Sequence, residues 1–220
     1  VVDIASKPAP ALKSFLLFGE HPRELISPEL SLNLAKHLCA NPTAAILSKA
    51  QFRMVPLANK WGRAQLEAGN DCIRCNEDGV DLNRNWASHW QAAVAADSTN
   101  SGCTAGSGPK AFSEPETQGL QALLTGYKPH MFVSVHSGAL GMYTPHAFDQ
   151  KVPQTGAQGA HEAAMLDMLA KLNTKSGDCP YGAAGKEVGY TCPGTCLDYA
   201  FEQVNVPYSF AFEIFNTNRA

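Results

Sequence analysis

The sequence has no apolar run long enough to span a bilayer, because its longest candidates, Ser14–Phe18 and Met131–Val135, have the length of single strands. It also lacks an excess of positive charge. The formal net charge is −3 over 220 residues, which does not provide the basic surface that nucleic acids or anionic membranes require. There is no repeat and no low-complexity tract. The hydrophobic fraction of 45% and the charged fraction of 17% indicate an ordinary globular protein with one sizeable core.

Cysteine, by contrast, is abundant for a chain of this size. The seven cysteines are Cys39, Cys72, Cys75, Cys103, Cys179, Cys192 and Cys196. The two close pairs do not have the spacing of a zinc ribbon, because the second pair encloses three residues, including Pro-Gly. Disulfides in an oxidising compartment explain the cysteines better than reduced thiols do, and the odd number leaves at least one thiol without a partner in the chain.

The chain begins with Val-Val-Asp, without Met and without the pattern of a signal peptide. We therefore expect a processed, trimmed or fragmentary chain. Together with the cysteines, this predicts a secreted protein or one in the lumen of a vacuole or lysosome.

The hydrophobic pattern predicts strands that alternate with helices. Strands are expected at 13–18, 52–57, 130–137 and 207–215. Helices are expected from an N-cap at Ser27 to about residue 40, from a capping box of Ser113 and Glu116 to about Leu124, over 159–172 and briefly over 198–202. The glycine-rich stretches 59–112 and 179–195 are expected to be long loops. This order predicts an α/β fold, a three-layer α/β/α sandwich around a mixed, mostly parallel twisted sheet.

The segment Asp78–Trp86 contains a candidate carboxylate-binding pair. It places Asn83 and Arg84 side by side behind Asp81. The guanidinium of arginine matches a carboxylate bidentately, and the neighbouring amide adds another donor. An Asn-Arg pair alone is more typical of a solvated turn, so its interpretation depends on the ionisable residues elsewhere in the chain.

Candidate zinc ligands follow two of the predicted strands. His21 and Glu24 lie three residues apart after the first strand, a spacing that brings an imidazole and a carboxylate to one side of a turn. His136 closes a later strand, where side chains of open α/β sheets face a cleft. Separately, these features are also typical of a charged helix entrance and of a hydrogen-bonded structural histidine. Together they form the three-ligand set of catalytic zinc.

Glu213 lies in the last predicted strand. Alternation places Ser209, Ala211 and Glu213 on one face of this strand and Phe210 and Phe212 on the other. A carboxylate among so many apolar neighbours is costly unless a charge or a metal compensates it, although a strand-end glutamate can also reach solvent. Beside a zinc site, Glu213 would be a general base.

In this order and spacing, the motifs resemble those of the zinc carboxypeptidases of the carboxypeptidase A type, the M14 metallocarboxypeptidase family. The resemblance extends over nearly the whole chain, from Phe15 to Phe215. It implies one Zn²⁺ per chain, held by His21, Glu24 and His136.

The resemblance also implies roles for the other candidate residues. Glu213 would be the catalytic glutamate, and Arg74, nine residues before Asn83, would polarise the scissile carbonyl. Asp81 would support His21. The residues expected to bind substrate are Arg23, Asn83, Arg84, Tyr190 and Leu197. Among these, Tyr190 matches the mobile tyrosine that closes on the substrate.

The implied reaction is hydrolysis of the C-terminal amino acid of a peptide. We expect an apolar or aromatic preference, because Leu197 stands where an aspartate would attract Lys or Arg. The partners would be peptide or protein C-termini, the protein is expected to be a monomer, and a family-like disulfide would join Cys103 to Cys75 or Cys72. Family domains usually extend further at both ends, so residues 1–220 are expected to form a single catalytic domain that is incomplete at both ends and lacks some terminal elements.

Two alternatives remain open from the sequence. One is an acyl-amino-acid amidohydrolase similar to aspartoacylase, whose relatives share the zinc motif and Asp-Leu-Asn-Arg. The position of Tyr190 relative to Asp198, the Arg74 spacing and the abundance of cysteine disfavour it. The other is a catalytically inactive binding module on the same scaffold, which the presence of all three ligands and Glu213 disfavours.

Zinc is expected to bind at one atom per chain, and His136→Ala is expected to abolish most of this binding because it removes one of three ligands. Metal analysis of purified wild-type and variant protein measures the outcome. Full zinc occupancy in His136→Ala would contradict the ligand set.

Overall fold

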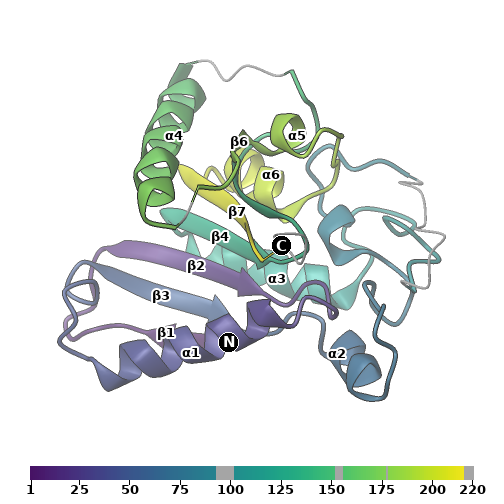
Figure 1. Cartoon of the computed structure of the whole chain (residues 1–220), viewed down its shortest axis with the longest axis horizontal. Helices are drawn as coiled ribbons and strands as arrows, with labels where there is room; N and C mark the ends of the chain where they lie inside the picture. The colour runs from purple at the N-terminus through teal and green to yellow at the C-terminus, as the bar shows by residue number, and fades with distance from the viewer. Residues whose placement is uncertain (93–101, 152–155, 177, 216–220) are drawn as a thin grey trace.

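The computed structural model describes residues 1–92, 102–151, 156–176 and 178–215, without the side chains of 156–158 and 176. Its centre is a sheet with the strand order β1-β3-β2-β4-β7-β5-β6 (Figure 1). The strands are β1 Val2–Ile4, β2 Leu12–Phe18, β3 Ala50–Val55, β4 Met131–His136, β5 Leu140–Thr144, β6 Tyr181–Ala183 and β7 Tyr208–Ile214. Strands β3, β2, β4 and β7 run parallel, whereas β1 and β5 join antiparallel to β3 and β7.

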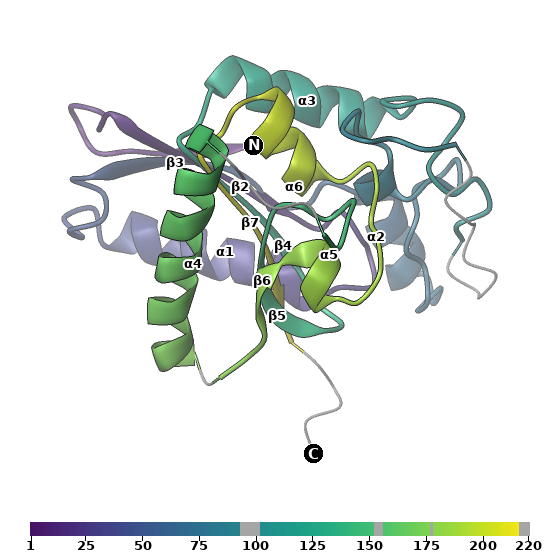
Figure 2. The same ribbon diagram turned by 90° about the horizontal axis from the view of Figure 1, so that it is seen from above.

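Helices cover both faces of this sheet (Figure 2). They are α1 Ile26–Ala40, α2 Lys60–Glu67, α3 Pro115–Tyr127, α4 Gly156–Ser176, α5 Ala184–Glu187 and α6 Cys196–Asp198, with the 3₁₀ turn η1 Leu82–Arg84 and the π-helical turn η2 Tyr199–Gln203. Helices α1 and α4 pack on one face, and α3 and η2 pack on the other. The predicted three-layer α/β/α sandwich is therefore confirmed. Within the described residues, no helix has both the length and the apolarity to cross a membrane.

Strand β2 shows why the central strands are largely apolar. Leu16 and Phe18 point into the core beneath α1 and α4, whereas Phe15 and Leu17 point into the core beneath α3. A parallel strand covered by helices on both sides carries apolar side chains on both of its faces rather than only at alternate positions. The compact run that predicted a strand here therefore also indicates its central place in the sheet.

The predicted N-cap at Ser27 is wrong. Helix α1 begins after Leu25, which makes no side-chain capping bond, and Ser27 lies fully buried inside the first turn. Its hydroxyl donates to the carbonyl of Val135 at 2.6 Å and accepts from the N–H of Gly19 at 3.1 Å. Ser27 therefore joins α1 to the ends of β2 and β4, which is where the candidate metal ligands emerge.

The predicted capping box at Ser113 and Glu116 is also wrong. Helix α3 begins after Glu114, whose side chain makes no capping bond. The amide oxygen of Asn85, 29 residues away in sequence, accepts from the N–H of Glu114 and at 2.7 Å from the hydroxyl of Thr117. The cap is therefore tertiary, and it fixes the loop that carries the Asn-Arg pair against α3.

The stretches expected to be loops contain additional elements. Helix α2, with an N-cap at Asn59, lies in the first of them, and β6 and α5 lie in the second. Strands β1 and β5 were not predicted either. These elements are short or rich in glycine, and tertiary pairing rather than local pattern supports them. The part of the first loop at 93–101 lies outside the described residues.

Ser27→Ala is expected to lower the free energy of unfolding by about 1–3 kcal/mol, because the Gly19 N–H and the Val135 carbonyl would lose a buried partner. Ser48→Ala is the matched control, since Ser48 is exposed and bonds only within its own turn; it is expected to cost less than about 0.5 kcal/mol. Urea unfolding measures both. Equal stability of the two variants would contradict the linking role of Ser27.

Candidate active site

The candidate site lies where the parallel strands end. His21 and Glu24 follow β2, His136 ends β4, and Glu213 lies near the end of β7. The register of β4 and β7 places His136 directly beside Glu213. Because the carboxyl ends of parallel strands meet at one edge of a sheet, residues far apart in sequence converge there.

The three predicted zinc ligands lie within hydrogen-bond distance of one another. Nδ1 of His21 lies 2.7 Å from one carboxylate oxygen of Glu24, and Nδ1 of His136 lies 3.0 Å from the other. The two Nδ1 atoms are 3.2 Å apart. All three side chains are buried. Two imidazole nitrogens and a carboxylate directed at one point form a donor set that fits zinc.

The protonation preferences of this cluster follow from its charges. Burial would raise the pKa of Glu24, but the imidazoles of His21 and His136 hold it well below its usual range. Burial likewise would lower the pKa of His136, but Glu24, together with hydrogen bonds from its other neighbours, raises it well above its ordinary value. The cluster therefore stabilises positive charge beside Glu24, as a cation site must.

Asp81 connects the metal ligands to the rest of the cleft. One of its oxygens lies 3.1 Å from Nε2 of His21 and accepts from the N–H of Asn83, and the other accepts from Nε of Arg74 at 2.9 Å. Burial opposes ionisation, but Arg74 and His21 hold the pKa of Asp81 well below its usual value. The contact leaves Nε2 of His21 facing Asp81 and Nδ1 facing Glu24. That Asp81 supports a zinc ligand remains a prediction.

A single cleft brings most of the remaining predicted residues together. Arg74, Asn83, Arg84, Tyr190, Leu197 and Glu213 line it beside His21 and His136. The amide oxygen of Asn83 accepts from the N–H of Cys196, and Arg84 donates to the carbonyl of Asn83 at 2.7 Å. Among the described residues, no carboxylate forms a direct ion pair with Arg84, although its charge helps to lower the pKa of Asp81. Arg84 lines the cleft.

Glu213 and Tyr190 differ in their exposure. Burial raises the pKa of Glu213 above its ordinary value, although His136 opposes the shift. Tyr190 is 59% exposed on the loop between α5 and α6, at the rim of the cleft. Because its side chain is largely exposed, Tyr190 has space to change its conformation, whereas the backbone of Glu213 is held in β7.

Arg23 is the predicted site residue that lies apart from the others. It is exposed and donates to the carbonyl of Cys72 at 3.4 Å. It lines a neighbouring depression together with Glu24, Leu25, Ile26 and Phe215. If Arg23 binds peptide as expected, it does so in this neighbouring depression and not in the main cleft.

The structure also identifies the expected disulfide. Cys103 is bonded to Cys75, with 5.1 Å between their Cα atoms, and Cys72 remains a thiol. The prediction of a bridge to one of these two residues is confirmed. The expectation that disulfides explain the cysteines better than reduced thiols holds for this pair alone, because Cys39, Cys179, Cys192 and Cys196 are thiols as well. Cys179, Cys192 and Cys196 are buried, whereas Cys39 is exposed.

Sequence reasoning did not include the residues behind His136. Glu20, Ser134 and Cys196 surround its outward-facing Nε2 and are all buried. The available signal was only a glutamate directly before the first candidate ligand. The apolar wall of the cleft, formed by Tyr143, Ala147, Ala184 and Val188, was also missed, because it comes from short elements that were not predicted.

A family model described as zinc carboxypeptidase matches residues 5–219 of the chain. The chain belongs to the zinc carboxypeptidase family. Its relatives include zinc carboxypeptidase A 1 of Drosophila melanogaster, 27% identical over 91% of this chain and 48% of that protein, and carboxypeptidase B of Astacus astacus, 28% identical over 92% of this chain and 70% of that protein. The chain thus spans about half the length of the Drosophila protein.

Solved structures share the fold of this zinc carboxypeptidase family member. Bovine thrombin-activatable fibrinolysis inhibitor, solved with tick carboxypeptidase inhibitor, superposes with a TM-score of 0.80 at 22% identity, covering 99% of this chain and 74% of that one. Carboxypeptidase A from Helicoverpa armigera also gives 0.80, at 20% identity over 96% and 55% of the two chains. These matches support the architecture described above.

Proposed function

We propose that the chain carries the active site of a zinc-dependent exopeptidase that removes the C-terminal amino acid of peptides. The guanidinium of Arg84, which lines the cleft without a direct ion-pair partner among the described residues, carries this proposal. A free carboxylate is the group that satisfies such a cation bidentately, and a peptide presents one only at its C-terminus. Internal peptide bonds would leave the guanidinium unpaired.

The proposed zinc ligands are His21, Glu24 and His136, with one ion per chain. Family membership and the donor set described above support this assignment. Zinc in such a site supplies a Lewis acid that makes water nucleophilic near neutral pH. Asp81 orients His21, and the chain's other residues perform the remaining steps.

Glu213 is the proposed general base and acid. Its carboxylate accepts a proton from the attacking water and returns it to the leaving amine. Its raised pKa suits the first step, because a carboxylate with a higher pKa takes up the proton more readily. Arg74 is held by Asp81 through Nε, so its terminal N–H groups are the proposed donors to the carbonyl oxygen as negative charge develops.

The remaining residues would bind the substrate. Asn83 and Arg84 would hold the terminal carboxylate, and Tyr190 would close over it from the rim. Arg23 would contact peptide residues further from the C-terminus, in the neighbouring depression. The disulfide between Cys75 and Cys103 fits a secreted or luminal protein, and we propose that it acts as a monomer.

The pocket supports a preference for apolar or aromatic C-terminal residues. Leu197 is 2% exposed and lines the cleft with Ala147, Ala184, Val188 and Ala211. The nearby carboxylate of Asp198 accepts from the N–H groups of Ala147 and Phe148, and Glu187 is not among the residues that line the cleft. A substrate ammonium would therefore be buried without a partner, which is costly.

Glu213→Gln is expected to lower kcat on a blocked dipeptide by about 10²–10⁴-fold while zinc content is unchanged, because the amide cannot accept the proton. Turnover with and without a chelator tests the metal requirement in the same assay. Chelator-insensitive turnover, or near-normal activity of Glu213→Gln, would refute the mechanism. Hydrolysis of acetyl-aspartate in place of the dipeptide would support the amidohydrolase alternative, and zinc binding without turnover of either would support a binding module.

Leu197→Asp is expected to shift kcat/KM from dipeptides ending in Phe or Leu toward those ending in Lys or Arg, because it supplies the missing negative charge. Leu197→Asn is the matched control: it is expected to weaken the apolar preference without favouring basic residues. A preference of the wild type for Lys or Arg would contradict the assignment of this pocket.

A further inference from the structure

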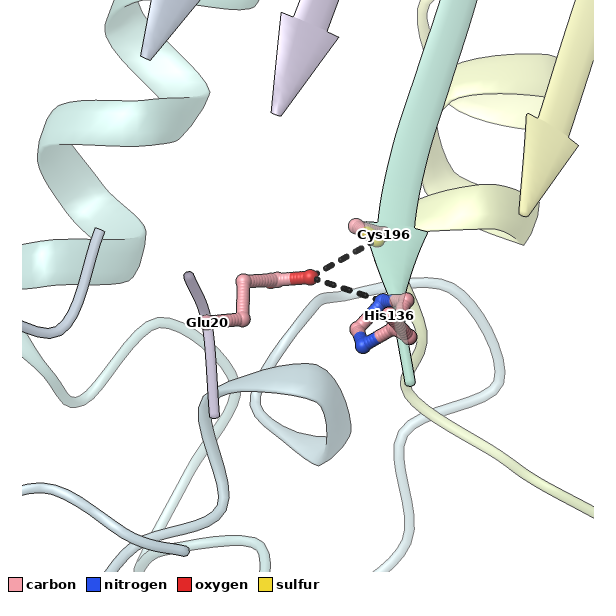
Figure 3. A group of neighbouring side chains, drawn as sticks. All are labelled: Glu20, His136 and Cys196. Carbon is pink, nitrogen blue, oxygen red and sulfur yellow. Dashed lines mark hydrogen bonds and ion pairs between the residues drawn. The ribbon is translucent and has the colours of Figure 1, made fainter. Parts of the chain in front are cut away.

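A buried carboxylate lies behind His136, on the side away from the proposed zinc site. Glu20 directly precedes His21 and is 1% exposed. Figure 3 shows its carboxylate directed between Cys196 and the ring of His136. Nδ1 of His136 faces Glu24, so the opposite ring nitrogen, Nε2, faces Glu20 at 3.5 Å. The proposed reaction assigns no task to Glu20.

The hydrogen bonds around Glu20 run in one direction. The hydroxyl of Ser134 donates its single hydrogen to Oε2 of Glu20 at 3.1 Å. The same hydroxyl lies 2.7 Å from Nε2 of His136 and must therefore accept from it. The indole of Trp86 donates to Oε1 of Glu20, and the thiol of Cys196 donates to Oε2 at 3.3 Å.

We propose that Glu20, acting through Ser134, is a positioning residue for the zinc ligand His136. The relay from Nε2–H through the Ser134 hydroxyl to Glu20 keeps the proton on Nε2 and the lone pair of Nδ1 directed at the metal. It also makes the imidazole a stronger donor, because hydrogen bonds in a chain polarise one another. This inference rests on the proposed role of His136 as a zinc ligand.

Charge compensation supports the same arrangement. Among the described residues, His136 is the basic group within ion-pair distance of Glu20. A buried carboxylate is costly without a compensating charge, and an imidazole bound to a divalent cation supplies part of one. Asp81 likewise contacts Nε2 of His21, but it does so directly and not through a hydroxyl group. Each histidine ligand thus has a carboxylate behind it.

Glu20, His136 and Cys196 also lie close enough to hold an ion themselves. The relay is favoured over such an ion site because Nε2 of His136 is already hydrogen-bonded to the Ser134 hydroxyl at 2.7 Å and the Cys196 thiol already donates to the carboxylate of Glu20. A second bound ion is therefore an outcome that the experiment must distinguish.

The test is the zinc dissociation constant of the folded protein, measured by competition with a chromophoric chelator. Glu20→Gln is expected to weaken binding by about 10–100-fold. If the glutamine NH₂ faces Ser134, it donates where Glu20 accepted, and the direction of the hydrogen bonds is reversed. If the NH₂ faces Trp86, two N–H donors oppose each other. Ser134→Ala is expected to weaken binding as well, and the double variant by less than the product of the two single effects, because both interrupt one relay.

Cys196→Ser is the matched control, because serine still donates to Glu20; it is expected to change zinc affinity by less than about twofold. A spectroscopic measurement separates positioning from general destabilisation. In zinc-loaded, ¹⁵N-histidine-labelled protein, the Nε2–H proton of His136 is expected downfield, and it should move upfield in Ser134→Ala even if that variant is as stable as the wild type.

The outcomes separate this inference from the proposed function. Wild-type zinc binding that depends on His136 but is unchanged in both Glu20→Gln and Ser134→Ala would overturn the relay alone. A second equivalent of zinc, lost in Cys196→Ser, would overturn it in favour of a separate ion site. Absence of zinc binding by the wild type would overturn both proposals.

Discussion

The candidate site depends on the burial of Glu24 between two imidazoles. Its carboxylate lies within 3.0 Å of Nδ1 of both His21 and His136, in a region that solvent barely reaches. Such a charge is tolerated only where positive charge and hydrogen bonds compensate it. The surrounding polar network, with Asp81 behind one histidine and Ser134 and Glu20 behind the other, follows from this requirement.

The sheet supplies the convergence that this network needs. The parallel strands β2 and β4 end at the same edge, and β7 brings Glu213 beside His136. Ser27 joins the first helix to the ends of two of these strands, and Asn85 fixes the Asn-Arg loop against α3. Long-range hydrogen bonds from buried polar side chains therefore position the functional loops, where local turn chemistry alone would not.

The sequence predicted the features that depend on short stretches of chain. The central strands were identified because residues such as Phe15–Phe18 are apolar at every position. The proposed metal ligands were chosen because they lie at or after the ends of those strands. The errors at Ser27 and Ser113 have a common cause: both residues fit local capping patterns, but distant partners bind them instead. Strand β6 has no local pattern, because it is held by pairing with β5, which is remote in sequence. Glu20 was missed because a glutamate beside a histidine is not informative until both are known to be buried.

The disulfide between Cys75 and Cys103 affects one half of the site more than the other. It closes the segment that contains Asp81, Asn83 and Arg84, whereas His21, Glu24 and His136 lie outside that segment. A cross-link of this kind removes conformational freedom before a ligand arrives, so that less binding free energy is spent on ordering the loop. Under the proposed function, the redox state of the surroundings would determine whether the substrate-binding residues Asn83 and Arg84 are preorganised. The proposed metal ligands would depend on the redox state only through Asp81.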